Sequence, residues 1–203
     1  MEKSIQKPIK LAIKRSLHDR IREVNQKETL ALLLDRSGSM VGERIVALKK
    51  ATELLVNEVD FTKYNMSIHF FPPLQSLLLK IGNPFVIVNE VNSVTTGGDT
   101  PMAGAMSETI GEQCQRAILV SDGEPTDNPL ALLKRMKENC AKMPIIDCVH
   151  IGDSPRSEET LRTIAQETGG TYQKFTDLEK LKKSFKYLSP KYYGLLREGK
   201  IGG

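Results

Sequence analysis

Apolar runs alternate along the chain with stretches in which apolar residues recur every three or four positions. Residues 29–34 carry four consecutive aliphatic side chains, which is typical of a strand buried on both faces. Residues 43–59 have the helical spacing instead. The same two patterns predict strands over 66–71, 77–81, 117–120, 145–151 and 171–174, and helices after Thr100, over 129–140, from 157 to about 167, and over 177–188.

This alternation of strands and helices predicts an α/β fold with a doubly wound, mostly parallel central sheet and helices on both faces. The link around Pro72-Pro73, between the strands at 66–71 and 77–81, is too short for a parallel crossover. We therefore expect one antiparallel strand at an edge of the sheet. The stretch 83–96 fits either a strand or the approach to a short helix.

A chain of 203 residues is long enough for one sizeable core, so we expect one domain over 29–188. A basic N-terminal extension, 1–28, precedes it. Leu17, Ile21 and Val24 form a helical stripe there, which we expect to pack on the domain, with partner binding as the alternative. A basic tail, 189–203, follows the domain and ends in Gly-Gly, which we interpret as a flexible end.

The net charge of +4 is unevenly distributed along the chain. Residues 1–28 and 174–203 are basic, whereas 29–173 carry 18 acidic and 13 basic residues. Basic ends can contact nucleic acid, anionic lipid or an acidic partner, or can form an ordinary solvated surface. We find no membrane span or signal peptide, and the three cysteines lack CxxC spacing. Reduced thiols and a cytoplasmic location are therefore expected.

The polar residues that carry candidate chemistry follow the buried strands. Asp35, Ser37 and Ser39 come after the first strand, Thr100 follows a glycine loop, and Asp122 ends the strand at 117–120. In open α/β sheets, ligands bind at the carboxyl ends of the strands. These side chains offer only oxygen atoms, which suits Mg²⁺, with Mn²⁺ as the alternative. With few carboxylates, the ion stays under-neutralised and can accept one more from outside.

Each of these residues also has a purely structural interpretation. Thr100 is a good helix N-cap with Pro101 at the first helical position, and Ser37 can turn the chain. Asp99 and Asp127, near the same rim, are interpreted as turn or cap residues rather than ligands. The combination of three segments favours a metal site over three separate structural roles.

At these residues the chain resembles a von Willebrand factor A (vWA) domain with its metal-ion-dependent adhesion site. The family motif is Asp-x-Ser-x-Ser, then a distant Thr and a distant Asp, and all five positions match over a resemblance covering 29–188. The resemblance implies that Ser37, Ser39 and Thr100 ligate the metal directly, and that Asp35 and Asp122 act directly or through waters. A Glu or Asp of a partner would complete the shell.

The resemblance also implies a non-catalytic protein-interaction module, acting as an adaptor or regulatory subunit of a multiprotein assembly. Some members of the family work with AAA+ ATPases. The chain contains no P-loop, so such an ATPase would be a separate subunit.

Two other functions are weighed against this one. A Mg²⁺-dependent phosphohydrolase would use Asp35 as its nucleophile, but Ser37 stands where such enzymes carry a second carboxylate. A nucleic-acid-binding accessory protein would use the basic ends and would show steep salt dependence. No Ser/His/Asp or Cys/His arrangement is evident, and His18, His69 and His150 lie outside the motifs.

Overall fold

The structure of the chain is a computed structural model that describes residues 27–73, 75–111, 114–139, 143–185 and 188–189. The expected N-terminal helix around Leu17, Ile21 and Val24 therefore lies outside the described residues, as do His18 and nearly all of the basic tail.

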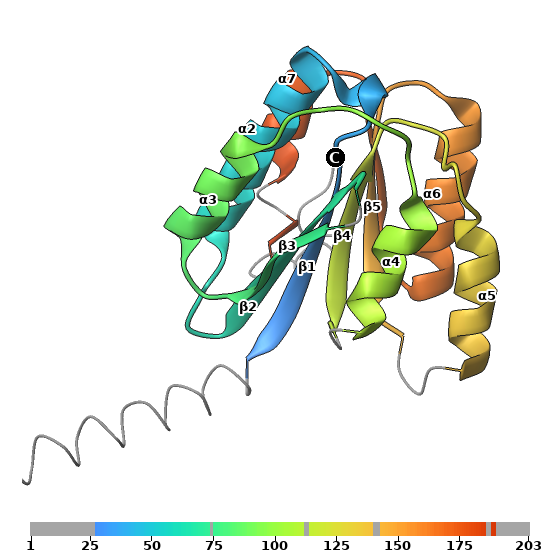
Figure 1. The fold of residues 1–203 in the computed structure, drawn as a ribbon, viewed down its shortest axis with the longest axis horizontal. Helices are drawn as coiled ribbons and strands as arrows, with labels where there is room; N and C mark the ends of the chain where they lie inside the picture. Colours follow the sequence, from blue (N-terminus) through green and yellow to red (C-terminus); the bar gives the residue numbers. More distant parts are fainter. Residues whose placement is uncertain (1–26, 74, 112–113, 140–142, 186–187, 190–203) are drawn as a thin grey trace, which may run out of the picture.

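The described chain folds around one six-stranded sheet (Figure 1), with the strand order β3-β2-β1-β4-β5-β6. Five strands run parallel to one another, and β3 lies antiparallel to β2 at one edge. The strands are β1 (Glu28–Asp35), β2 (Tyr64–Phe71), β3 (Gln75–Ile81), β4 (Arg116–Ser121), β5 (Ile145–Ile151) and β6 (Tyr172–Phe175).

Helices cover both faces of this sheet, as the alternating sequence pattern predicts (Figure 1). One face carries α2 (Glu43–Glu58), α3 (Pro84–Ser93) and α7 (Leu178–Phe185). The other face carries α4 (Met102–Gly111), α5 (Pro129–Asn139) and α6 (Pro155–Thr168). A short 3-10 helix, η1 (Gly38–Met40), lies between β1 and α2.

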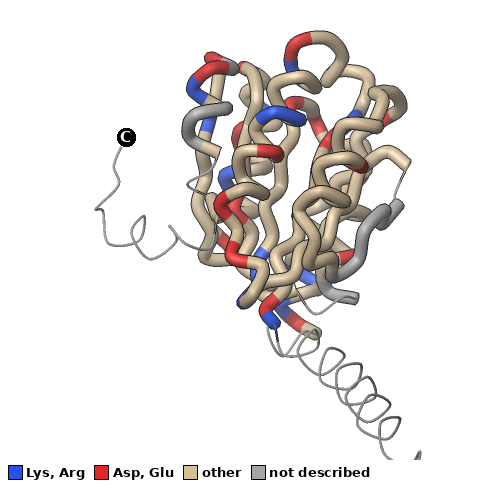
Figure 2. Tube along the Cα trace, turned by 90° about the vertical axis from the view of Figure 1, so that its left-hand side faces the viewer, with Lys and Arg blue, Asp and Glu red and all other residues tan. Residues whose placement is uncertain are grey.

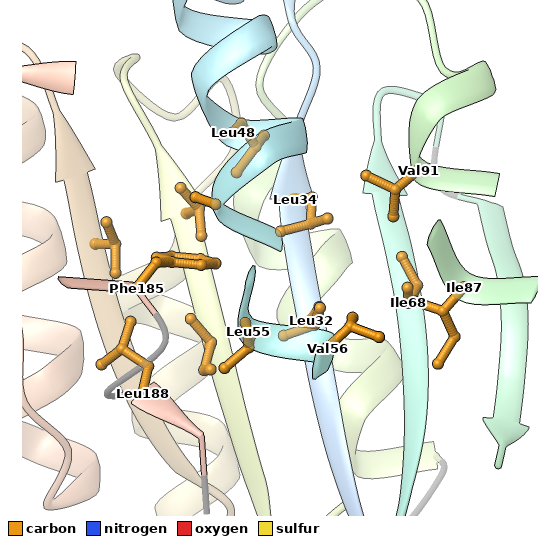
Figure 3. Close-up of a cluster of buried hydrophobic side chains, with 14 of the residues drawn as sticks. Leu32, Leu34, Leu48, Leu55, Val56, Ile68, Ile87, Val91, Phe185 and Leu188 are labelled. Atoms are coloured by element: carbon orange, nitrogen blue, oxygen red, sulfur yellow. The ribbon is translucent and has the colours of Figure 1, made fainter. Parts of the chain in front are cut away.

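The central strand β1 explains why its sequence reads as an unbroken apolar run. Alternate side chains enter the two helix-covered cores: Leu32 and Leu34 pack on the α2 side, whereas Ala31 and Leu33 pack on the α4 side. Figure 3 shows the first of these cores. There, β1 meets side chains from α2, α3, β2 and the C-terminal region, including Leu48, Leu55, Val56, Ile68, Ile87, Val91, Phe185 and Leu188.

The strand order reverses at β1, whose neighbours are β2 on one side and β4 on the other. The helices that follow β1 and β4, which are α2 and α5, lie on opposite faces of the sheet. Their connecting loops therefore diverge from the carboxyl ends of these two strands, which is where open α/β sheets bind ligands. This strand order places the loops that carry the candidate residues beside each other.

The ambiguous stretch 83–96 forms the helix α3. Asn83 caps it, because the backbone N–H of Phe85 donates to Asn83 Oδ1 over 3.0 Å, and Pro84 occupies the first helical position. Helix α6 likewise begins at Pro155, two residues earlier than expected, with Ser154 Oγ accepting from the N–H of Ser157. In both helices the capping residue is followed by a proline at the start of the helix.

Basic and acidic positions are interspersed along the described chain trace (Figure 2). Within the same residues, no helix has the length and apolar character that crossing a membrane requires.

The predicted helix over 177–188 is α7, whose Leu181 and Phe185 are buried in the core together with Leu188.

Candidate functional site

Asp35 is the last residue of β1, and its side chain is enclosed by the protein with 0% exposure. The N–H of Ser37 donates to Asp35 Oδ1 over 2.8 Å, and Ser121 Oγ donates to Asp35 Oδ2 over 2.5 Å. Burial raises the pKa of Asp35 to about 6, although the hydrogen bonds from Ser121 and Ser37 act in the opposite direction. The carboxylate therefore fixes the start of the first loop and ties β1 to β4.

The two serines of the first loop connect it to Asp122. Ser37 Oγ and Ser39 Oγ lie 3.0 Å apart, and Ser39 Oγ donates to Asp122 Oδ1 over 2.7 Å. Ser37 and Asp122 are buried, whereas Ser39 lies at the exposed rim. Ser37, Ser39 and Asp122 thus form a continuous chain of hydrogen bonds between the ends of β1 and β4, with Ser39 at the solvent side.

Thr100 joins these residues from the third segment. A Cβ added at Gly123 would lie 3.2 Å from Thr100 Oγ1 and 3.3 Å from Ser39 Oγ, so the two hydroxyls converge on the space that this glycine leaves open. The backbone holds Thr100 in place, because the N–H of Thr126 donates to the Thr100 carbonyl over 2.9 Å. All five predicted residues therefore lie in one small region.

Backbone contacts hold the first loop against the glycine loop that precedes Thr100. The N–H of Gly97 donates to the Arg36 carbonyl over 2.8 Å, and the N–H of Gly38 donates to the Gly98 carbonyl over 3.0 Å. Gly98 has φ +84°, and a Cβ there would come within 2.6 Å of Pro72 Cγ. Only glycine both adopts this positive φ readily and has no Cβ to collide with Pro72, which explains the need for a glycine at this position.

Sequence reasoning missed Arg44, a residue of the first turn of α2. Its Nη1 forms an ion pair with Asp122 Oδ2 and donates to the Ser39 carbonyl over 3.3 Å. The Arg44 side chain is 43% exposed, whereas that of Asp122 is 0% exposed, so the guanidinium lies between the carboxylate and solvent. No local pattern marks this residue, because its partner is 78 positions away.

Ser121 was missed as well, although a signal for it existed. The alternation of side chains along β4 places Ser121 on the same sheet face as Asp35, and the two occupy neighbouring positions at the ends of adjacent strands. A hydroxyl next to a buried carboxylate in neighbouring strands is a predictable hydrogen-bond partner once the strand order is known.

The start of α4 corrects one prediction. The helix begins at Met102, after the expected Thr100-Pro101 start, and the N–H groups of Ala103 and Gly104 donate to the two carboxylate oxygens of Asp127 over 2.8 and 2.9 Å. Asp127 therefore caps α4, which agrees with its interpretation as a cap residue rather than a ligand. A carboxylate reaching across from a neighbouring loop supplies the acceptors that we had assigned to Thr100.

The donor set can be tested against the geometry of a hard cation. Two oxygens that bind Mg²⁺ at right angles, each about 2.1 Å from the ion, are about 3.0 Å apart. The Ser37 and Ser39 hydroxyl oxygens have this separation. In the described part of the chain, no group of three or more His, Cys, Asp or Glu could hold a metal ion. The candidate site therefore depends on hydroxyl oxygens, and its oxygen-only set fits Mg²⁺ or Mn²⁺.

Comparisons with solved structures identify the fold. The vWA domain of SpRpn10 matches with a TM-score of 0.63 at 15% identity, covering 81% of this chain and 96% of that domain. Proximal thread matrix protein 1 from the mussel byssus matches with a TM-score of 0.63 at 16% identity over 78% of this chain. The pilus adhesin SpaC from Lactobacillus rhamnosus GG, in its open conformation, matches with a TM-score of 0.63 at 15% identity over 79% of this chain.

These likenesses define the class of structure: the chain has a vWA-like fold. The matched region spans 44% of the mussel protein and 29% of the pilus adhesin, so the likeness concerns only a part of each. No protein-family model and no curated protein sequence matches the chain.

Proposed function

We propose that this protein is a metal-dependent protein-interaction module. Mg²⁺, or Mn²⁺ in its place, would be held by Ser37, Ser39 and Thr100, with Asp35 and Asp122 supporting the site directly or through waters. The ion would supply an open coordination position for an acidic side chain of a partner protein. The chain itself would hold the three hydroxyls and the two carboxylates in place around the ion.

The observation that carries this proposal is the convergence of oxygens from three separate loops. Ser37 Oγ, Ser39 Oγ and Asp122 Oδ1 follow one another at 3.0 and 2.7 Å, and Thr100 Oγ1 faces the same space beside Gly123. Two buried carboxylates close together are electrostatically unfavourable, and Arg44 balances only one of their two negative charges. A divalent ion would offset that cost.

The surroundings of Asp35 favour binding over catalysis. A nucleophilic carboxylate must reach its substrate, but Asp35 is 0% exposed and both of its oxygens accept hydrogen bonds. The position two residues further on is Ser37, whose N–H and hydroxyl are engaged with Asp35 and Ser39. These contacts support a positioning role for Asp35, and we propose that the protein is not an enzyme.

We further propose that the partner belongs to a multiprotein assembly, in which this chain acts as an adaptor or regulatory subunit. A separate AAA+ ATPase subunit is one such partner. The fold supports the adaptor role, because helices cover both faces of the sheet. The polar side chains of the candidate site lie in the loops at the carboxyl ends of the strands.

Direct measurement of metal binding tests the first part of the proposal. Mn²⁺ is titrated into the wild-type protein and free Mn²⁺ is followed by electron paramagnetic resonance, with Mg²⁺ as competitor. We expect one site in the wild type and at least a roughly tenfold loss of affinity when Ser37 and Ser39 are both changed to alanine. Asp99→Ala, an exposed aspartate on the same rim, serves as the matched control and should keep the wild-type affinity.

Partner capture tests the second part. Wild-type, Asp35→Ala and Asp99→Ala proteins are used as baits with either Mg²⁺ or EDTA. We expect a set of partners that requires both Mg²⁺ and Asp35. Recovery of the same partners in every arm would contradict the metal-bridged mechanism.

A phosphatase assay separates the enzyme alternative. Aryl phosphate turnover by the wild type that disappears in Asp35→Asn would contradict the non-catalytic assignment. We expect equal background rates from the two proteins.

A further inference from the structure

The ion pair between Arg44 and Asp122 places a fixed positive charge inside the candidate site. Arg44 Nη1 contacts the Asp122 oxygen that Ser39 does not use, and it also donates to the Ser39 carbonyl. The two oxygens of Asp122 therefore have different partners, the hydroxyl that would ligate the ion and a guanidinium. Arg44 is thus joined to both residues that define the outer part of the site.

This arrangement changes the charge balance of the site. Asp35 and Asp122 together carry at most two negative charges when ionised, whereas the three proposed direct ligands are neutral hydroxyls. With Arg44 paired to Asp122, the side chains carry one net negative charge, so a site loaded with a divalent ion has one excess positive charge. A charge of this size close to an ion both weakens the hold on the ion and strengthens the attraction for an outside anion.

We propose that Arg44 is a specificity-determining residue that makes the loaded site selective for a carboxylate-bearing partner. The guanidinium withdraws part of the negative charge of Asp122 from the ion, which lowers the affinity for the metal and raises the affinity of the loaded site for one acidic side chain. This inference rests on the proposed metal-dependent function. It attributes the preference for an anionic partner to Arg44, a residue outside the five-residue motif.

The arrangement of the helix supports the assignment. Arg44 belongs to the first turn of α2, so its position relative to Asp122 is set by a helix that packs in the core through Ala47, Leu48 and Ala51. Its side chain is 43% exposed, which leaves guanidinium surface for the incoming carboxylate while Nη1 remains on Asp122. A guanidinium has five N–H donors, so both contacts can be made together.

Two measurements on four proteins test this proposal. The proteins are the wild type, Arg44→Met, Arg44→Gln and the matched control Arg156→Met. Arg156 is 80% exposed and pairs with Glu124 at 3.2 Å, so its replacement removes the same charge from the surface without touching Asp122. Mn²⁺ affinity is measured by electron paramagnetic resonance. Acetate is then titrated into each Mn²⁺-loaded protein, and water proton relaxation reports the displacement of water from the ion.

We expect Arg44→Met to bind Mn²⁺ at least about fivefold more tightly and acetate at least about fivefold more weakly than the wild type. Arg156→Met should stay within about twofold of the wild type in both measurements. Arg44→Gln removes the same charge but keeps a polar side chain, so it keeps the test decisive if the Met variant is unstable. It should show the same two shifts.

The outcomes distinguish this inference from the function on which it rests. Unchanged or weaker Mn²⁺ binding in both Arg44 variants, with normal binding by the wild type, overturns the role of Arg44 alone. Unchanged acetate affinity in both variants also overturns it. No Mn²⁺ binding by the folded wild-type protein overturns the proposed function, and the inference with it.

Discussion

At the scale of single residues, the two aspartates of the candidate site have different surroundings. Asp35 accepts from a backbone N–H and from Ser121, both of which belong to the framework of the loop and the sheet. Asp122 accepts from Ser39 and Arg44, which lie toward solvent. We therefore expect Asp35 to position the first loop and Asp122 to control the charge that an ion experiences.

Two adjacent glycines follow α6, and each position requires glycine for a different physical reason. Gly169 ends the helix in the left-handed region, with φ +73° and open space around its Cα. A Cβ on Gly170 would instead lie 2.0 Å from the Ile146 carbonyl oxygen and 2.5 Å from its carbon. The backbone of β5 therefore excludes any side chain at position 170.

We predict that Gly170→Ala lowers the free energy of unfolding by about 3 kcal/mol or more, because a backbone strand must move to admit the methyl group. Gly169→Ala should cost about 1 kcal/mol, the strain of a left-handed conformation. Urea denaturation of both variants measures the difference. Equal losses would show that β5 can yield at this point.

His150 is the residue from which a pH dependence is expected. It is fully buried, its Nδ1 lies 3.1 Å from the Tyr172 hydroxyl, and its Nε2 has no hydrogen-bond partner within the described residues. Burial lowers the pKa of His150, and so does the nearby positive charge of Lys174. The carboxylates that act in the opposite direction belong to Glu158, Asp122 and Asp153.

We predict that His150 makes the wild-type protein less stable as the pH falls below 6.5, the ordinary pKa of histidine, whereas Asp35, whose pKa burial raises to about 6, acts in the opposite direction. Because the folded protein holds His150 neutral, the unfolded chain takes up the proton more readily, and the free energy of unfolding decreases. His150→Gln should show a smaller decrease between pH 6.5 and about 5. Urea denaturation across this pH range measures both slopes, and identical slopes would exclude His150 as their source.

At the scale of elements, several helices begin with the same two-residue signal. Asn83-Pro84 starts α3, Asn128-Pro129 starts α5 and Ser154-Pro155 starts α6, in each case with the side chain accepting from an N–H of the first turn. The signal works for two reasons. Proline lacks an N–H at a helix position where no N–H donor is needed, and the preceding side chain accepts a hydrogen bond from another N–H of the first turn. Helix α4 differs, because its acceptor comes from a distant loop.

We predict that Asp127→Ala lowers the free energy of unfolding by about 1–2 kcal/mol, because two N–H groups at the start of α4 lose their acceptors. Asn128→Ala is the comparison variant, since the exposed Asn128 accepts one such bond, from Ala131 over 2.9 Å. Its loss should be smaller, at most about 1 kcal/mol. Thermal and urea denaturation measure both, and a smaller effect of Asp127→Ala would show that water replaces the carboxylate.

At the scale of the whole molecule, polar contacts join strands that are far apart in the sequence. Asp147 of β5 is buried and accepts from Arg116 of β4 through Nε and Nη2 over 2.6 and 2.9 Å. It also accepts from the N–H and hydroxyl of Thr171, just before β6, over 2.9 and 2.8 Å. One carboxylate therefore connects β4, β5 and the start of β6 near the amino ends of these strands. The candidate site lies at the opposite, carboxyl ends.

We predict that Asp147→Ala costs about 3–5 kcal/mol, because it leaves the largely buried Arg116 without this counter-charge. Glu53→Ala removes the exposed pair with Lys50 and should cost less than about 1 kcal/mol. Both variants are measured by urea denaturation. A loss for Asp147→Ala no larger than that for Glu53→Ala would mean that the buried pair adds nothing to stability.

How much could be predicted depends on the range over which each feature is determined. The buried strand at 29–34 and the helix at 43–59 follow from local periodicity, and the structure confirms both within one or two residues. The stretch 83–96 remained ambiguous until tertiary packing buried Ile87 and Val91 against the sheet. Metal binding by Ser37, Ser39 and Thr100 stays a prediction.

The sequence by itself determined the α/β class, the main elements and five oxygen-bearing residues at the ends of strands and loops, because apolar period and turn chemistry act over a few residues. Only the tertiary structure decided the strand order and the partners of those residues. Ser121 and Asp35 are 86 positions apart, and Arg44 and Asp122 are 78 apart. Such contacts depend on how the whole sheet closes, so the arginine that balances the charge of the candidate site became visible only in the folded protein.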